Sequence, residues 1–153
     1  MKWHGQKGFT IAELLIVVFI LGVLALISAA TFKSLRDAAA LRLGVQEVHT
    51  AFLDSRNSSI SSENNTVYGV HLSSTTVTRF VGDTYTAGAS SNIVYTFEGG
   101  VMATSTFIEN SVDIVFSRLT GEANATGSVT LSNEQHTAST TITINASGLV
   151  ESE

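Results

Sequence analysis

The distribution of apolar and polar residues divides the chain into two regions. Residues 9–30 read FTIAELLIVVFILGVLALISAA and contain one ionisable side chain, that of Glu13. As a helix, this run would extend about 33 Å at about 1.5 Å per residue, close to the hydrocarbon thickness of a bilayer. We therefore expect residues 9–30 to form a membrane-spanning helix.

A helical period continues after the apolar run, over residues 31–56. Apolar residues recur there at steps of three or four and share one face, whereas charged residues occupy the other. The apolar positions are Ala38, Leu41, Val45, Val48 and Phe52, and the charged ones are Arg36, Arg42, Glu47 and Asp54. This pattern predicts an amphipathic continuation of the same helix, with its apolar face packed on a sheet of the same domain.

The rest of the chain shows strand patterns. Residues 57–65 are rich in Ser and Asn, which compete for backbone hydrogen bonds, so a loop is expected there. Short β-branched and aromatic stretches then recur between turn residues, at residues 66–72, 76–81, 92–98, 112–117, 128–131 and 140–145. No helical pattern of about ten residues separates them, which disfavours parallel crossover units. The predicted fold is α+β, a long N-terminal helix packed on an antiparallel domain that could form a two-sheet sandwich.

Composition and charge narrow the classes of function. The chain has no Cys, so disulfides and thiolate metal sites are excluded. Lys2 and Lys7 precede the apolar run, and the positive-inside rule then places residues 1–8 in the cytoplasm and residues 31–153 outside it. Beyond residue 30, six Lys and Arg stand against twelve Asp and Glu. This acidic balance disfavours nucleic acid as a partner.

The carboxylate of Glu13 is the unusual feature of the apolar run. A charged side chain inside a membrane span costs on the order of 3 kcal/mol at the bilayer centre and less near its end, so Glu13 requires a partner. Cleavage between Gly8 and Phe9 would create an α-amino group one turn from Glu13. That amine could pair with Glu13 within one chain or with Glu13 of a neighbouring subunit, and the second pairing would set axial register.

The junction KGFTIAELL, residues 7–15, resembles the class III leader of type IV pilins and type II secretion pseudopilins. The resemblance implies that a prepilin peptidase cleaves after Gly8 and methylates Phe9, and that Glu13 serves assembly. It covers about the first thirty residues. Ala12 stands where isoleucine is more usual, and Ala30 lies near the place of a common proline, so the resemblance does not extend to local melting of the helix there.

The second half resembles the GspH/FimT minor pseudopilins more loosely. The resemblance rests on the order of helix, Ser-rich loop, the strand YGVH (residues 68–71) and the last strand ITINASG (residues 142–148). It implies two packed antiparallel sheets capped by the helix, and a minor or tip-associated subunit. The chain then divides into a cytoplasmic leader (residues 1–8), a transmembrane and assembly helix (9–30), an amphipathic continuation (31–56) and a β-rich globular domain (57–153).

The predicted function is that of a pilin-like structural subunit, held in the cytoplasmic membrane and assembled into a type IV pilus or a type II secretion pseudopilus. Small residues of the span, Gly22, Ala25 and Ala29, would allow close helix packing in the filament. The expected partners are the membrane, other pilin or pseudopilin subunits, the prepilin peptidase and an assembly platform protein. The resemblance also implies a cytoplasmic ATPase that drives extraction from the membrane.

Three other interpretations stay open. Residues 28–30 (Ser-Ala-Ala) offer a signal-peptide cleavage site, which would make the chain a secreted protein and allow a secreted hydrolase. The apolar run could be a plain single-span anchor. The chain could also be a membrane-tethered extracytoplasmic binding domain that does not polymerise. Glu13 is the objection to the first two, because signal peptides and plain anchors are apolar at that place.

Catalytic and metal-binding patterns are weak. The four histidines, His4, His49, His71 and His136, have no metal-ligand spacing. The acidic residues Asp83, Glu98, Asp113 and Glu122 lack the dense acidic loop of a calcium site. Neither a Gly-x-Ser-x-Gly nor a Gly-x-x-x-x-Gly-Lys motif occurs. We therefore predict no enzyme, no metal and no cofactor.

Overall fold

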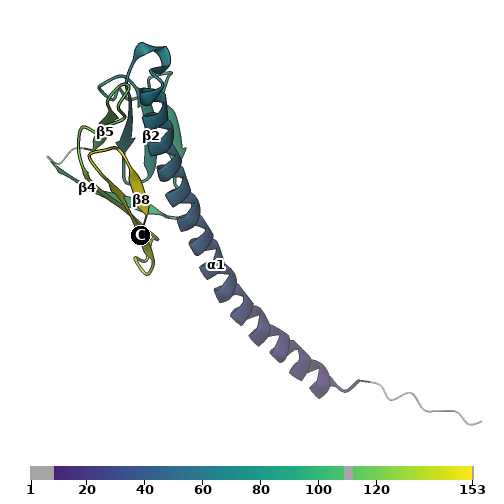
Figure 1. Cartoon of the computed structure of the whole chain (residues 1–153). Coiled ribbons are helices and arrows are strands. Elements are labelled where there is room, and N and C mark those ends of the chain that lie inside the picture. Colours follow the sequence, from purple (N-terminus) through teal and green to yellow (C-terminus); the bar gives the residue numbers. More distant parts are fainter. Residues whose placement is uncertain (1–8, 109–111, 153) are drawn as a thin grey trace, which may run out of the picture. The chain divides into compact units, whose positions relative to one another are not determined.

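The structure, a computed structural model, describes residues 9–108 and 112–152, apart from the side chains of residues 28–31. Helix α1 (Ile11–Ile60) is followed by the short 3₁₀ helix η1 (Glu63–Asn65) and by strands (Figure 1). The strands are β1 (Tyr68–Leu72), β2 (Thr76–Val81), β3 (Ile93–Thr96), β4 (Met102–Phe107), β5 (Asp113–Phe116), β6 (Gly127–Ser132), β7 (Ser139–Ile144) and β8 (Val150–Ser152). Two compact units result, Met1–Arg36 and Asp37–Glu153, and α1 contributes to both.

Two four-stranded sheets form the C-terminal unit. Sheet A has the strand order β3-β2-β1-β5, and sheet B has the order β4-β6-β7-β8. Every pair of neighbouring strands is antiparallel. The predicted α+β class, a long N-terminal helix followed by antiparallel sheets, is confirmed.

One hydrophobic core joins α1 to both sheets. Its buried side chains include Leu41, Val48, Ala51 and Phe52 from α1, Val70, Leu72, Val77, Ile114 and Phe116 from sheet A, and Phe107, Val129, Leu131, Ile142 and Ile144 from sheet B. In β5, β6 and β7 the buried apolar residues alternate with more exposed ones, as the period of two along a strand requires, whereas β1 is buried at all but one of its positions. The Phe52 and Phe116 rings meet edge to face at 6.2 Å between centroids. The apolar stripe of α1 thus packs as predicted, except that Ala38 is exposed.

The end of the helix differs from the prediction. α1 continues past Arg56 to Ile60, so residues 57–60 are helical rather than a loop. Two serines bind sheet A there: the Ser59 hydroxyl accepts the Tyr68 N–H at 2.9 Å, and the Ser55 hydroxyl donates to the Gly69 carbonyl at 3.3 Å. The side chains of Ser55 and Ser59 therefore bind a neighbouring strand, whereas the Ser61 hydroxyl donates to the Ser58 carbonyl of the helix. The helix ends because Ser62 takes the left-handed conformation (φ 54°).

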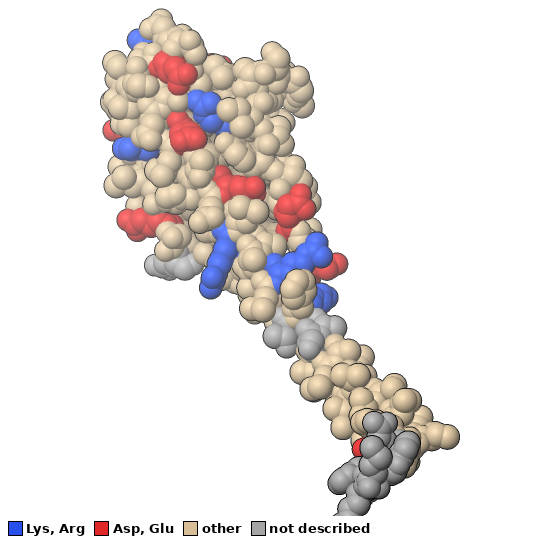
Figure 2. Space-filling view, turned by 90° about the vertical axis from the view of Figure 1, so that its right-hand side faces the viewer, with Lys and Arg blue, Asp and Glu red and all other residues tan. Residues whose placement is uncertain are grey.

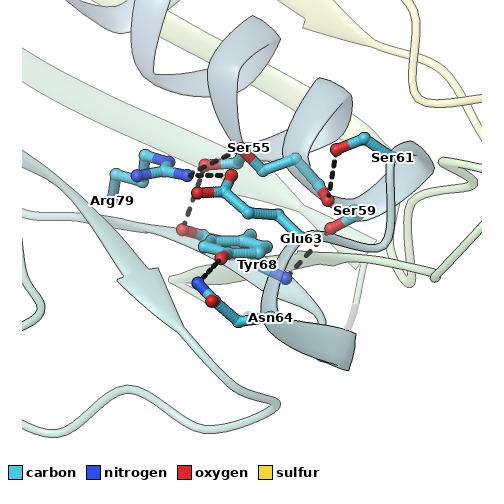
Figure 3. A network of polar contacts seen from close by, with 9 residues as sticks. Ser55, Ser59, Ser61, Glu63, Asn64, Tyr68 and Arg79 are labelled. Atoms are coloured by element: carbon cyan, nitrogen blue, oxygen red, sulfur yellow. Dashed lines mark hydrogen bonds and ion pairs between the residues drawn. The ribbon is translucent and has the colours of Figure 1, made fainter.

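A network of polar contacts connects the end of α1 to sheet A (Figure 3). The Arg79 guanidinium lies over the Tyr68 ring, 4.6 Å from its centroid, and donates to the Ser58 hydroxyl at 2.8 Å. A Glu63 carboxylate oxygen lies 3.9 Å from the same guanidinium, and the Asn64 amide donates to the Tyr68 hydroxyl at 3.1 Å. These contacts hold the segment after α1 against β1 and β2.

Strands β4 and β8 were not predicted from the sequence. β4 reads MATSTF, and only its last residue, Phe107, is fully buried, so the stretch carries a weak apolar signal. β8 has three residues. Both are outer strands of sheet B, and pairing with β6 and β7 defines them. Local propensity is a poor guide for such strands, because their stability comes from cross-strand neighbours.

Glu47 was expected on the solvent side of α1, but it is half-buried. Its Oε2 atom is enclosed and has no hydrogen-bond partner among the described residues. Burial, and secondarily the carboxylate of Glu98, raise the pKa of Glu47 above its usual value. The charged form of Glu47 is therefore a destabilising element of the C-terminal unit.

Candidate functional site at the start of helix α1

Two residues stand between the expected cleavage point and the helix. Gly8 lies outside the described residues, whereas Phe9 and Thr10 are described and are not helical. α1 begins at Ile11. The Phe9 side chain is 81% exposed, so it makes little contact with the helix that follows. The residue that would become the new N-terminus is therefore accessible.

Thr10 caps the helix. Its hydroxyl oxygen accepts the backbone N–H of Glu13 at 3.2 Å, and its carbonyl accepts the N–H of Leu14 at 3.2 Å. An N-cap side chain satisfies one of the amide donors that have no partner in the first helical turn. This role of Thr10 was not predicted from the sequence. The spacing Thr-x-x-Glu before an apolar run is a capping-box signature and could have revealed it.

Glu13 lies in the first turn of α1 and is exposed. The N-terminal end of a helix carries partial positive charge, which favours a carboxylate at this position. Among the described residues, the ion pairs join His71 to Asp113 and Arg79 to Glu63, and neither involves Glu13. Within the described part of the chain, the charge of Glu13 is therefore not balanced by a basic side chain.

The surface around Glu13 is apolar and uncovered. Large apolar side chains from Ile11 to Ile27 are between 41% and 83% exposed, including Phe19 at 72%. Charged side chains of both signs are spread over the C-terminal unit, whereas the apolar part of α1 shows almost no charged surface (Figure 2). α1 is long and apolar enough to cross a membrane, with a mean hydropathy of 2.9 in its most apolar window.

The small residues of this segment were predicted to permit helix packing. A Cβ atom added to Gly22 would meet nothing within 4 Å, so this position is open on the surface of the chain. Ala25 is exposed as well, and the side chain of Ala29 lies outside those described. Their role in packing stays a prediction.

The three described histidines, His49, His71 and His136, do not gather at one metal site. His4 lies outside the described residues, His49 lies on α1, and His136 lies 2.9 Å from the Ser132 hydroxyl through its Nδ1 atom. His71 is 2.5 Å from a carboxylate oxygen of Asp113 through Nδ1, and its ring stacks on Tyr85 at 3.8 Å.

The stacking of Tyr85 on His71 attaches the segment after β2 to the outer face of sheet A. Of the four acidic residues considered for calcium, Asp113 is thus bound to a histidine. Within residues 9–108 and 112–152, no three His, Asp or Glu side chains gather as metal ligands.

Comparison with known proteins adds one match. The family model described as the prokaryotic N-terminal methylation motif matches residues 3–29. The match includes the junction at Gly8 and Phe9, the cap at Thr10 and the apolar segment. It supports a pilin-like subunit that is processed by a prepilin peptidase and anchored in the membrane, as in type IV pilins and pseudopilins. No curated protein and no solved structure matches the chain.

Proposed function

We propose, from the pilin-type methylation motif in residues 3–29, that this chain is a structural subunit of a type IV pilus or a type II secretion pseudopilus. In this proposal the subunit is a minor one of the GspH/FimT type and has no enzymatic activity. The observation that carries the proposal is the carboxylate of Glu13 in the first turn of an exposed apolar helix. The two antiparallel sheets behind an amphipathic helix support the GspH/FimT assignment.

In this proposal the exposed apolar segment is covered by lipid before assembly and by other subunits afterwards. Before assembly, lipid covers the side chains of residues 11–27, and the C-terminal unit lies outside the cytoplasm. In the filament, the same side chains pack against helices of other subunits. Extraction exchanges lipid contacts for helix contacts, so the net hydrophobic gain is small, and close packing at Gly22, Ala25 and Ala29 contributes instead. External work from a cytoplasmic ATPase, acting through an assembly platform protein, completes the transfer.

Cleavage supplies the positive charge that Glu13 lacks. Hydrolysis of the Gly8–Phe9 peptide bond adds water across it, leaving a carboxylate on Gly8 and an ammonium group on Phe9. Methylation of that amine keeps its positive charge. The ammonium group of one subunit can then pair with Glu13 of its neighbour, and each pair fixes the axial register of the two helices.

The first experiment determines the mature N-terminus by mass spectrometry. A product that begins at Phe9 and carries an added methyl group supports the proposal. A product that begins at Thr31 would instead identify a signal peptide. A chain that retains residues 1–8 would identify a tethered domain and would contradict the proposed processing.

The second experiment replaces Glu13 by Gln, which keeps the shape and removes the charge. We expect the assembled fraction to fall by about tenfold or more, because a buried amine would lose its partner. Glu134→Gln is the matched control, since Glu134 is exposed on the C-terminal unit. The assembled fraction is measured by immunoblotting of filaments sheared from cells. Equal assembly of the Glu13→Gln variant and the wild type would contradict the proposal.

A further inference from the structure

Two features lie at opposite ends of the part of α1 that belongs to the C-terminal unit. One is an exposed leucine on the turn at residues 117–122, and the other is an apolar groove beside residues 38–46 of α1. We infer that the turn of one copy of this chain docks in the groove of the next copy, so that C-terminal units stack head to tail. This inference rests on the proposed function, because such stacking occurs in a filament, and it names one contact between subunits.

The turn holds its leucine in an unusual conformation. Leu119 has a φ of 70°, and its side chain is 65% exposed. The left-handed region is rarely occupied by bulky apolar residues. The other non-glycine residues with positive φ in the described part of the chain are Ser, Asn or His. The core makes little use of the Leu119 side chain, so the fold of one copy does not explain a leucine at this position, and a contact with another molecule does.

A second exposed leucine lies on the neighbouring turn between β7 and β8. Leu149 is 52% exposed and directly follows Gly148. A Cβ atom on Gly148 would collide with the Gly121 carbonyl oxygen, so the two turns touch. Both exposed leucines are therefore carried by adjoining turns.

The groove lies between α1 and the start of β7. Its volume is about 450 Å³, and its lining includes Ala38, Leu41 and Val45 from α1 and Ala138 and Thr140 from the other side. The small and apolar side chains of this lining suit an apolar side chain such as leucine.

A copy cannot fill its own groove with its own turn. The Leu119 N–H donates to the Ser59 carbonyl at 3.0 Å, so the turn lies beside the end of α1. At about 1.5 Å per residue, about 20–30 Å of helix separates Ser59 from residues 38–46. A contact between different surfaces of two copies repeats along an open helical filament unless it closes into a ring.

Charges at the two ends are complementary. Glu122, in the turn, is exposed, and among the described residues its carboxylate contacts the Thr120 hydroxyl alone, at 3.4 Å. Arg42, in the groove, is exposed and belongs to neither of the ion pairs of the described residues. The two side chains can pair across the contact, which would steer the turn toward the groove. A carboxylate in the turn disfavours the alternative occupant of the leucines, a lipid surface with anionic headgroups.

Cysteine crosslinking tests this contact, because the chain has no Cys of its own. Thr120→Cys marks the turn and Gln46→Cys marks the groove, and both positions are exposed. We expect mild oxidation of filaments sheared from cells to link the double variant into dimers, trimers and longer chains. Each single variant should stay monomeric, and a mixture of the two single variants should give dimers without longer chains.

Leu119→Asn, placed in the double-cysteine background, tests the leucine itself. Asn adopts the left-handed conformation more readily than Leu, so the thermal midpoint in detergent micelles should equal or exceed that of the parent. The crosslinked fraction should fall about fivefold, because the apolar contact is lost. Leu43→Asn is the matched control: Leu43 is 46% exposed on α1 and does not line the groove, so crosslinking should be unchanged.

Charge reversal tests the ion pair. Arg42→Glu should lower the crosslinked fraction about threefold, and the added change Glu122→Arg should restore it, because the pair then exists with its charges exchanged. A double reversal that crosslinks no better than Arg42→Glu alone would overturn the pairing of these two residues.

The outcomes separate this inference from the proposed function. Filaments in which the double-cysteine variant does not crosslink would overturn the inference and leave the proposed function intact, whether the turn then meets lipid or another protein. Dimers from Thr120→Cys alone would overturn it as well, because they indicate contact between two equivalent turns. An unchanged crosslinked fraction in Leu119→Asn would have the same consequence. If the chain enters no filament, the proposed function fails and this inference fails with it.

Discussion

The two halves of α1 have the same backbone conformation but differ in what covers their side chains. In the C-terminal half, Val48, Ala51 and Phe52 are fully buried by the sheets of the same chain. In the N-terminal half, side chains such as Phe19 and Leu26 are 72% and 75% exposed. One half therefore obtains its apolar environment from its own fold, whereas the other half is not covered by the described part of the chain, and we propose that lipid or other subunits cover it.

The polar residues of the two halves of α1 also differ in whether they have partners within the chain. In the C-terminal half, the hydroxyls of Ser55 and Ser59 hydrogen-bond with β1. In the N-terminal half, Glu13 has no basic partner among the described residues. A polar group in an apolar environment needs a partner, and the described part of the chain supplies one for the serines but no basic partner for Glu13.

The largest difference between the two halves is expected in the loss of stability when an aromatic side chain is removed. Phe52→Ala removes a fully buried ring and should lower the free energy of unfolding by about 3–5 kcal/mol. Phe19→Ala, the matched control in the exposed half, should leave it within about 0.5 kcal/mol. Denaturant unfolding of the full chain in detergent micelles, followed by near-ultraviolet circular dichroism, measures both. An equal loss in the two variants would show that the halves do not differ in this way.

Substitution of glycine by alanine should give the next largest difference in stability between the two halves. A Cβ atom on Gly69 would lie 2.4 Å from the Phe80 ring and 2.9 Å from the Ile114 carbonyl oxygen. Gly69→Ala should therefore destabilise the C-terminal unit by about 1–3 kcal/mol. Gly22→Ala meets nothing within 4 Å and should not destabilise it. The same unfolding assay compares them, and an unchanged Gly69→Ala midpoint would contradict the close packing.

The smallest effect concerns charge in the C-terminal half. The raised pKa of Glu47 means that the folded state binds the proton more tightly than the unfolded state, so stability falls as pH rises above 4.5, the ordinary value. Glu47→Gln should stabilise the protein at pH 7 by less than about 1 kcal/mol, and the gain should vanish below the ordinary pKa. Asp54→Asn, at an exposed position of the same helix, should show no such gain. A gain that is independent of pH would show that the charge is not its cause.

Most of the fold could be predicted because it depends on local periodicity. The residues of β2 (Thr76–Val81) match the predicted stretch, and the stripe through Leu41, Val48 and Phe52 is buried. β4 and β8 could not be predicted, since their pairing partners rather than their own residues define them. At the candidate site, Glu13 was prominent as a charge among apolar residues, whereas the cap at Thr10 was not predicted although its Thr-x-x-Glu spacing is a local signal.

The sequence by itself determined the division of the chain into an apolar helix and a β-rich unit, because hydrophobicity and its period are local properties. It also revealed that Glu13 is the one ionisable residue within the apolar run of residues 9–30. Only the tertiary structure decided that the serines at the end of α1 are helical, that Glu47 is enclosed and that His71 meets Asp113. These outcomes depend on contacts between residues far apart in the chain, and no local pattern contains them.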